Sequence, residues 1–373
     1  MTPAAQGRPP TGSDRPAGFG SSPASTLYDV AREAGVSTAT VSRVVHGYEG
    51  VRPATRQRVL LVIEALGYIP DGAAQSMARQ RKEVIGLVAV ESRSPDTDVE
   101  QEGLLFIEEV LRGVEFSLSK IEWSLLISLL SGDDPAAAFR RMQKVSAKVD
   151  GLLIIEGIVS SEQLALLAVR TPIVLVAGSP DEPHTDVFSA DNRAGTKALV
   201  SHLVEQHGRT RLFAIAGPRE APDARVRRSA LTDALAHYPG TRLAGSFEGR
   251  FAAMSGQLAV RDILTWPRSE LPDAIVCGND QMAIGAIREL QLAGIRVPAD
   301  IAVVGFDDMH SGTLVSPSLT TVRQPMRLLG ERACARLLER IADPALPRHV
   351  EQLPTELIVR ESCGCGEHGS GGQ

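Results

Sequence analysis

The spacing of apolar residues divides the chain into two parts. Between residues 26 and 70, apolar residues recur every three or four positions, as they do on one face of an amphipathic helix. From residue 84 onward, short continuous apolar runs alternate with longer amphipathic stretches. Continuous apolar runs are typical of parallel strands that are buried on both faces of a sheet. The pattern therefore predicts a small helical part, followed by a larger part in which strands and helices alternate.

Residues 27–46 are predicted to form two short helices joined by a tight turn. Thr26 is a suitable N-cap for the first helix, with Asp29 three residues further on. Gly35 stands where the turn needs a positive φ, and Ser37 is a suitable cap for the second helix. The apolar face of the second helix consists of three valines, Val41, Val44 and Val45.

A third helix is predicted to begin at Arg52-Pro53 and to end before Gly67. Three helices in so short a stretch bury little core, and such a module usually works attached to something larger. The outer face of the second helix carries short or polar side chains and one arginine: Thr38, Ala39, Ser42, Arg43 and His46. The pattern favours a helix-turn-helix whose second helix enters the DNA major groove, and the alternative is an ordinary helical hairpin with a solvated arginine.

These motifs resemble the DNA-binding headpiece of the lactose-repressor family of bacterial transcription regulators. The matching segments are Leu27-Tyr-Asp-Val-Ala, Gly35-Val-Ser, Thr40-Val-Ser-Arg-Val-Val45 and Gly67-Tyr-Ile-Pro70. The resemblance implies a headpiece at 26–70 and a hinge at 71–82, in which Met77 takes the place of an apolar minor-groove wedge. It also implies a set of DNA-binding residues: Thr26, Leu27, Tyr28, Ser37, Thr38, Ala39, Thr40, Ser42, Arg43, His46 and Met77.

The larger part, residues 83–362, is predicted to have an α/β fold. Helices are expected at 106–120, 136–148 and 196–206, and strands at 84–90, 124–130, 151–155, 173–177, 211–216, 274–277 and 301–304. Repeated βα units over this length indicate two lobes, each with a doubly wound parallel sheet. A ligand is expected in the cleft outside the carboxyl ends of the strands.

Polar residues recur in the loops that follow the predicted strands. They are Asp191, Asn192, Arg225, Arg227, Asn279, Asp280 and Asp307, with Phe251 in a further loop. Any one of them alone could be a helix cap or a surface residue. Together, carboxylates, amides and arginines beside an aromatic ring suit a polyhydroxylated ligand, because they offer hydrogen bonds to hydroxyls and a stacking face.

The resemblance extends to this part, which is similar to the family's effector-binding core and to periplasmic sugar-binding proteins. The matching segments include Gly217-Pro218, Asn279-Asp-Gln-Met-Ala283, Leu319-Thr-Thr-Val-Arg-Gln324 and Leu357-Ile-Val-Arg-Glu-Ser362. The resemblance implies that Arg227, Phe251, Asn279, Asp307 and Gln324 face a small effector, a sugar or a nucleoside. The acidic loop 91–103 departs from the family pattern.

The distribution of charge supports a DNA-binding N-terminal part. The formal net charge of the 373 residues is −6, yet residues 27–82 hold more Lys and Arg than Asp and Glu. A protein of this kind is expected to bind nucleic acid through its basic end only. Residues 1–25 are rich in Pro, Gly and Ser, which predicts a disordered tail without a signal peptide, and hence a cytoplasmic protein.

Three functions remain after these observations. The motifs favour a DNA-binding regulator that acts as a repressor. It is expected to bind a pseudo-palindromic operator as a homodimer or larger assembly, with contacts through 328–341 and 105–118. A sugar-binding transport protein is disfavoured by the added headpiece and the missing signal peptide. An enzyme is not expected, because the chain has no P-loop, nucleophile elbow or pair of histidines at metal-binding spacing.

No cofactor and no metal site are expected. Cys363 and Cys365 are close in sequence, but two thiols with no partner nearby in the sequence favour a flexible tail at 363–373 over a metal site.

Overall fold

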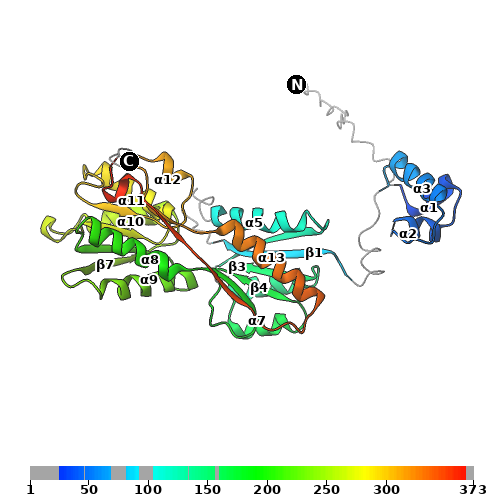
Figure 1. Ribbon diagram of the computed structural model, residues 1–373, viewed down its shortest axis with the longest axis horizontal. Coiled ribbons are helices and arrows are strands. Elements are labelled where there is room, and N and C mark those ends of the chain that lie inside the picture. Colours follow the sequence, from blue (N-terminus) through cyan, green and yellow to red (C-terminus); the bar gives the residue numbers. More distant parts are fainter. Residues whose placement is uncertain are drawn as a thin grey trace, which may run out of the picture. The chain divides into compact units, whose positions relative to one another are not determined.

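The computed structural model describes residues 25–45, 47–68, 81–91, 104–132, 134–155 and 159–366. The chain forms two compact units, one ending at Lys82 and the other beginning at Glu83 (Figure 1). Nearly all of the expected tail at 1–25, of the hinge at 71–82 and of the acidic loop at 91–103 falls outside the described residues. Within the described part of the chain, no helix is long and apolar enough to cross a bilayer.

The first unit contains the three predicted helices, α1 (Leu27–Ala34), α2 (Thr38–Val45) and α3 (Pro53–Leu66). Thr26 caps α1 as predicted, because its hydroxyl accepts from the Asp29 amide and the Asp29 carboxylate accepts from the Thr26 amide. Gly35 and Gly67 end α1 and α3 with φ of 62° and 57°. The helices bury one small core: Val30, Ala31, Ala34, Val41, Val44 and Val59.

The second unit begins with a lobe built on a six-stranded parallel sheet in the order β11-β5-β4-β3-β1-β2. The strands are β1 (Val84–Glu91), β2 (Ser124–Ser131), β3 (Gly151–Ile155), β4 (Ile173–Val176), β5 (Asp186–Ala190) and β11 (Val350–Leu353). Helices α5 (Leu104–Leu118) and α13 (Met326–Ala342) cover one face, and α6 (Pro135–Ser146) and α7 (Ser161–Ala168) cover the other.

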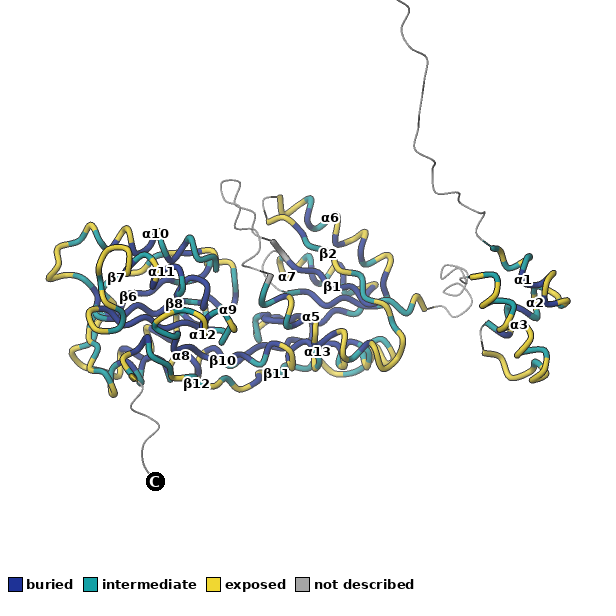
Figure 2. The backbone as a smooth tube through the Cα atoms, turned by 90° about the horizontal axis from the view of Figure 1, so that it is seen from above, coloured by how far each residue is buried: buried dark blue, intermediate teal, exposed yellow. Residues whose placement is uncertain are grey.

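The other lobe contains a four-stranded parallel sheet in the order β7-β6-β8-β9. Its strands are β6 (Arg211–Ala216), β7 (Arg242–Glu248), β8 (Ala274–Cys277) and β9 (Ala302–Val304). Helices α8 (Asn192–Ser201) and α9 (Pro222–Leu235) cover one face, and α10 (Ala253–Ile263) and α11 (Asp280–Leu292) cover the other. Figure 2 shows the buried backbone concentrated in the strands of both lobes. The predicted two-lobed α/β architecture is therefore confirmed.

Helices α5 and α13 lie side by side and approach each other closely (Figure 1). A Cβ on Gly113 would lie 1.9 Å from the Arg327 carbonyl oxygen, and one on Gly330 would lie 2.1 Å from the Val110 carbonyl oxygen. Only glycine fits at these two positions. The contact between α5 and α13 buries part of the surface, 105–118 and 328–341, that was predicted from the sequence to form dimer contacts. Phe116 and Leu328 remain 42% and 39% exposed on the same pair of helices.

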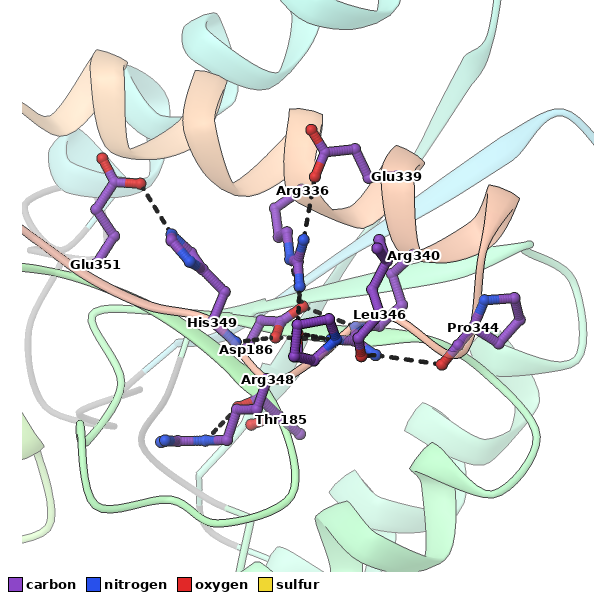
Figure 3. Close-up of polar contacts among 11 residues, drawn as sticks. Thr185, Asp186, Arg336, Glu339, Arg340, Pro344, Leu346, Arg348, His349 and Glu351 are labelled. Carbon is purple, nitrogen blue, oxygen red and sulfur yellow. Dashed lines mark hydrogen bonds and ion pairs between the residues drawn. The ribbon is translucent and has the colours of Figure 1, made fainter.

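A buried carboxylate ties the C-terminal elements to the first lobe (Figure 3). The fully buried side chain of Asp186 on β5 accepts hydrogen bonds from Arg340 at 2.7 and 2.9 Å, and from Arg336 at 3.0 Å. It also accepts from the backbone amide of His349 at 2.7 Å. Although burial by itself raises the pKa of Asp186, these hydrogen bonds hold the pKa below its usual value. Asp186 thus fixes both α13 and the start of β11.

The chain then returns to the second lobe. Strand β12 (Glu356–Ile358) pairs antiparallel with β10 (Thr321–Arg323), and the 3-10 turn η3 (Glu361–Cys363) follows. The expectation of a flexible tail from residue 363 is wrong for its first residues, because Cys363 is fully buried against the core of this lobe. Residues 367–373 lie outside the described part.

Candidate ligand site and DNA-reading surface

A cavity of about 210 Å³ lies between the two lobes. It is bounded by loops that follow β3, β4 and β9 and by the beginnings of α5, α9, α10 and α11, as expected for a cleft at the carboxyl ends of parallel strands. Its polar wall consists of Asp223, Arg227, Arg250, Asn279, Gln281, Asp307 and Gln324. Its apolar wall consists of Leu105, Phe106, Ile107, Ile155, Ala177, Ala221, Pro222, Phe251 and Met309.

Arg227 is the central cation of the polar wall. Its guanidinium lies over the Phe306 ring, with Cζ 3.8 Å from the ring centroid, and donates to the carbonyl oxygen of Gly278. The side chain is buried, and its nearest approaches to carboxylates are 3.6 Å to Asp223 and 3.9 Å to Asp307. Two carboxylates therefore share one fixed guanidinium, which leaves this part of the cavity with an excess of hydrogen-bond acceptors.

Burial raises the pKa of both carboxyl groups. It raises the pKa of Asp307 to about 6, although Arg227 and the hydrogen bond from Gln324 act in the opposite direction. It also raises the pKa of Asp223, against the opposing effects of Arg227 and Asn192. Groups whose pKa is shifted by burial in a cleft are typical of functional sites.

The amide of Gln324 is only partly satisfied. Its Nε2 donates to Asp307 Oδ1 at 2.6 Å. Among the described residues, Oε1 of Gln324 has no hydrogen-bond partner, although the atom is buried and the side chain lines the cavity. A buried acceptor without a partner costs free energy, and a donor supplied by a ligand would remove that cost.

Strained backbone is concentrated at the cavity. Three of its lining residues that are not glycine have positive φ: Ala177 at 58°, Phe251 at 62° and Asp307 at 127°. The Asn279 amide helps to hold this geometry, because its Nδ2 donates to the Phe251 carbonyl oxygen at 2.9 Å. The Phe251 ring lies against Gly217, where a Cβ would come within 2.3 Å of a ring carbon. Backbone of this kind clusters at ligand sites, where the surrounding structure compensates its cost.

The structure brings most of the sequence-predicted ligand residues together. Arg227, Phe251, Asn279, Asp307 and Gln324 line the cavity. Asn192 lies directly behind it, since its Oδ1 accepts from Arg227 and its Nδ2 donates to Asp223.

Three other predicted residues do not line the cavity. Asp191 caps α8 by accepting from the Ala194 amide, and Arg225 is turned to the carbonyl oxygen of Glu220. Asp280 is fully buried, where it accepts from the Thr321 hydroxyl and the Met309 amide.

Sequence reasoning missed several lining residues. Asp223 is four residues before Arg227 on α9, and this i, i+4 acid–base spacing was a signal that could have found it. The apolar residues from α5, β3 and the end of β4 carried no such signal. Their place in the cavity depends on how the lobes meet.

The headpiece presents the predicted DNA-reading face. Ala39 and Arg43 are exposed on α2, Thr38 and Ser42 are half-buried, and Tyr28 on α1 is exposed. Other predicted contact residues already have local partners: Thr26 caps α1, Ser37 caps α2 with Thr40 beside it, and Leu27 packs against the small core. His46 and Met77 lie outside the described residues.

A helix-turn-helix unit joined to a two-lobed core with a ligand-sized cleft defines the class of DNA-binding regulators that respond to small molecules. Residues 26–71 match the model of bacterial regulatory proteins of the lacI family, and residues 200–363 match the model of the periplasmic binding protein-like domain.

Known repressors are similar in sequence to this protein over almost the whole chain. The HTH-type transcriptional repressor PurR of Aliivibrio fischeri (strain MJ11) is 34% identical over 344 residues, which cover 90% of this chain and 98% of PurR. The ribose operon repressor of Escherichia coli K12 is 33% identical over 346 residues, covering 90% and 99%. The chain belongs to the lacI family of bacterial regulatory proteins, as its motifs suggested.

Solved structures of transcriptional regulators have a similar fold over almost the whole chain. The lac repressor dimer bound to operator and the anti-inducer ONPF has a TM-score of 0.80 and 29% identity, covering 91% of this chain and 99% of that one. The complex of the transcriptional regulator CelR with cellobiose has a TM-score of 0.66 and 29% identity, with the same coverage.

Proposed function

We propose that this protein is a cytoplasmic repressor that binds a pseudo-palindromic operator as a homodimer and releases or tightens it when a small polyhydroxylated molecule enters the cleft. The cavity wall is the observation that carries the ligand class. Two carboxylates, two guanidiniums and three side-chain amides face a space beside the Phe251 ring. A sugar or nucleoside has hydroxyls to donate to the carboxylates and an apolar face to lie on the ring.

The size of the cavity supports a small ligand. Its volume of about 210 Å³ lies below the range of about 300–1,000 Å³ found for drug-sized ligands. The unpartnered Oε1 of Gln324 calls for a hydrogen-bond donor, and the acceptors of Asp223 and Asp307 call for more. An apolar ligand would leave these groups buried without partners, so the wall discriminates against it.

The proposed binding of operator DNA depends on α2, the second helix of the headpiece. A single headpiece with one short recognition helix makes few base contacts, and two headpieces joined by their cores bind two half-sites. The remaining exposed faces of α5 and α13, which carry Phe116 and Leu328, are the surfaces we assign to the dimer contact. A monomer in sedimentation at micromolar concentration that still binds DNA specifically would contradict this assignment.

The test is a binding titration of the full-length protein on the DNA upstream of its own gene, with and without a panel of pentoses, hexoses, disaccharides and nucleosides. We expect one class of polyol to change the apparent Kd for DNA by about 5- to 150-fold. By linkage, the DNA must change the Kd for that polyol by the same factor. Arg225→Ala is the matched control, because Arg225 is on the same helix as Arg227 but points away from the cavity. A variant Arg227→Ala that keeps the full response would place the ligand elsewhere.

A further inference from the structure

Two histidines and two cysteines that the proposed function does not use meet at the far end of α8. His202 begins the π-helical turn η1 (His202–Gln206) and His207 follows it, while Cys363 ends η3 and Cys365 follows Gly364. One ligand atom of each residue lies within 4.8 Å of every other. The pairs are more than 150 residues apart in sequence, so only the fold brings them together.

The local backbone aims each pair at the same point. In an α-helix, residues five apart are rotated by about 140° from each other and face different sides. The i→i+5 turn of η1 removes most of that rotation, so the rings of His202 and His207 meet edge to face with centroids 4.9 Å apart. Gly364 has a φ of 115° and turns the chain between the two thiols. A π turn inside a helix is rare and is often found at a functional site.

Four of the six distances among the ligand atoms fit a tetrahedral metal ion, and all six lie within 4.8 Å. Around Zn²⁺ with bonds of about 2.05 Å to nitrogen and 2.3 Å to sulfur, ligand atoms lie about 3.3 Å apart for N–N and about 3.5 Å for N–S. In the structure, the two Nε2 atoms are 3.2 Å apart. The Sγ of Cys363 lies 3.3 Å from His202 Nε2, and that of Cys365 lies 3.4 Å from His207 Nε2 and 3.7 Å from His202 Nε2.

Hydrogen bonding alone does not account for this arrangement. The Nε2 of His202 has three neighbours, His207, Cys363 and Cys365. A ring nitrogen offers one donor or one acceptor, directed in the plane of the ring, so it satisfies only one of them. The alternative partner of the Cys363 thiol is the Arg360 carbonyl oxygen at 3.3 Å. A cation at the centre of the four atoms would bind all of them at once.

The fold holds the backbone that carries the two thiols. Ser362 donates from its hydroxyl to the Val303 carbonyl oxygen at 2.6 Å and accepts from the Thr320 amide at 2.9 Å. These bonds fix the C-terminal segment to β9 and to the start of β10, directly before Cys363. The thiols therefore sit on a fixed backbone, whereas a flexible tail would not hold them there.

We propose that His202, His207, Cys363 and Cys365 bind one Zn²⁺ ion per chain in a closed Cys₂His₂ site. Four protein ligands leave no open position for water or substrate, which is the arrangement of a structural site. On binding, the two thiols release their protons and bind as thiolates, and the two imidazoles bind as neutral rings through Nε2. The ion ties the C-terminal segment to the end of the helix that begins at Asn192.

The test is the metal content of the full-length protein, purified without a metal-affinity tag and dialysed against metal-free buffer. We expect elemental analysis by inductively coupled plasma mass spectrometry to find one zinc ion per chain. Reconstitution with Co²⁺ is expected to give the intense visible bands of a tetrahedral site and a thiolate-to-cobalt charge-transfer band.

Variants assign the ion to these residues. Cys365→Ser and His207→Gln are expected to lose the zinc and the tetrahedral cobalt bands. Cys365 is only half-buried, so its variant is the one expected to keep the fold. His237→Gln, at an exposed histidine outside the cluster, is the matched control and is expected to keep one zinc. A chelator should lower the Tm of the wild type but not that of Cys365→Ser.

The proposal is overturned if the folded wild type binds neither Zn²⁺ nor Co²⁺ at one per chain. Zinc retained in both ligand variants would also overturn it, as would a Cys363–Cys365 disulfide in protein prepared under reducing conditions. None of these outcomes depends on DNA or on the cleft ligand.

Discussion

Nε of Arg227 donates a hydrogen bond of 2.7 Å to Oδ1 of Asn192, and this contact joins the ligand cavity to a crossing between the lobes. Asn192 is the first residue of α8, two residues after β5 ends in the other lobe. A ligand that draws Arg227 toward itself therefore acts on a residue beside the crossover.

Asp307→Ala is expected to leave DNA binding intact and to abolish the ligand response. The side chain lines the cavity and its carboxylate is an acceptor for a ligand hydroxyl, while the headpiece is a separate compact unit. The measurement is the Kd for operator DNA with and without the polyol identified in the panel. A variant that still responds with the wild-type factor would show that the ligand site is elsewhere.

Ligand affinity is expected to fall as the pH drops below about 6. Burial raises the pKa of Asp307 to about 6, so below that pH the carboxyl is protonated and is a weaker acceptor for a ligand hydroxyl than the carboxylate is. If one proton is released when the ligand binds, the Kd for the ligand rises by up to about tenfold for each unit by which the pH falls below the pKa. Calorimetric titrations at several values between roughly pH 5 and pH 7.5 measure how the Kd for the ligand depends on pH.

The neighbouring carboxyls require a control for this pH dependence. Asp223 faces the same guanidinium, and Asp280 lies nearby with its pKa raised well above the usual range by burial and by Asp307. Asp307→Asn separates their contributions, because the slope should disappear in this variant. An unchanged slope would assign the proton to one of the other two groups.

Arg43→Ala is expected to weaken binding to the operator by about 1–3 kcal/mol, or roughly 5- to 150-fold, while binding to random DNA changes little. Arg43 is exposed on the outer face of α2, where its guanidinium suits the two acceptors of a guanine edge. Arg32→Ala on α1 is the matched control, since that side chain is 78% exposed and paired with Asp29. An equal loss on both DNAs would indicate a phosphate contact for Arg43.

Asp186→Ala is expected to destabilise the core by about 3–5 kcal/mol, because it leaves Arg340 without its carboxylate partner in a largely buried place and leaves Arg336 with only the exposed Glu339. Asp233→Ala removes an exposed partner of Arg193 and should cost no more than about 1 kcal/mol. Urea unfolding of both variants measures the difference in the free energy of unfolding. Equal effects would mean that the buried network contributes no more than a surface pair.

The sequence carried enough information for the elements that bury a regular apolar pattern. Thr26, Gly35, Pro53 and Gly67 marked the ends of the headpiece helices correctly, because caps and breakers act on their immediate neighbours. The continuous run at 84–90 forms β1, an interior strand of the first sheet, for the same local reason.

Contacts between distant segments were harder to predict. The cavity residues of α5 enter the site only through the packing of the lobes. The expectation that a flexible tail begins at Cys363 failed in the same way, because the histidine neighbours of Cys363 and Cys365 are more than 150 residues away in sequence. Asp191 and Asp280 were assigned to the ligand because an acid after a strand serves equally as a cap or as a buried anchor.

The position of β11 at the edge of the first sheet has a consequence for how the protein is made. This strand pairs with β5, yet it is synthesised after every helix of both lobes, and β12 and η3 complete the second lobe later still. The headpiece has its own core and emerges from the ribosome first. At about 5–20 residues per second, roughly 15–60 s separate the end of the headpiece from the last strands. Each new molecule therefore passes through a period in which its DNA-reading helices are finished and neither ligand-binding lobe is.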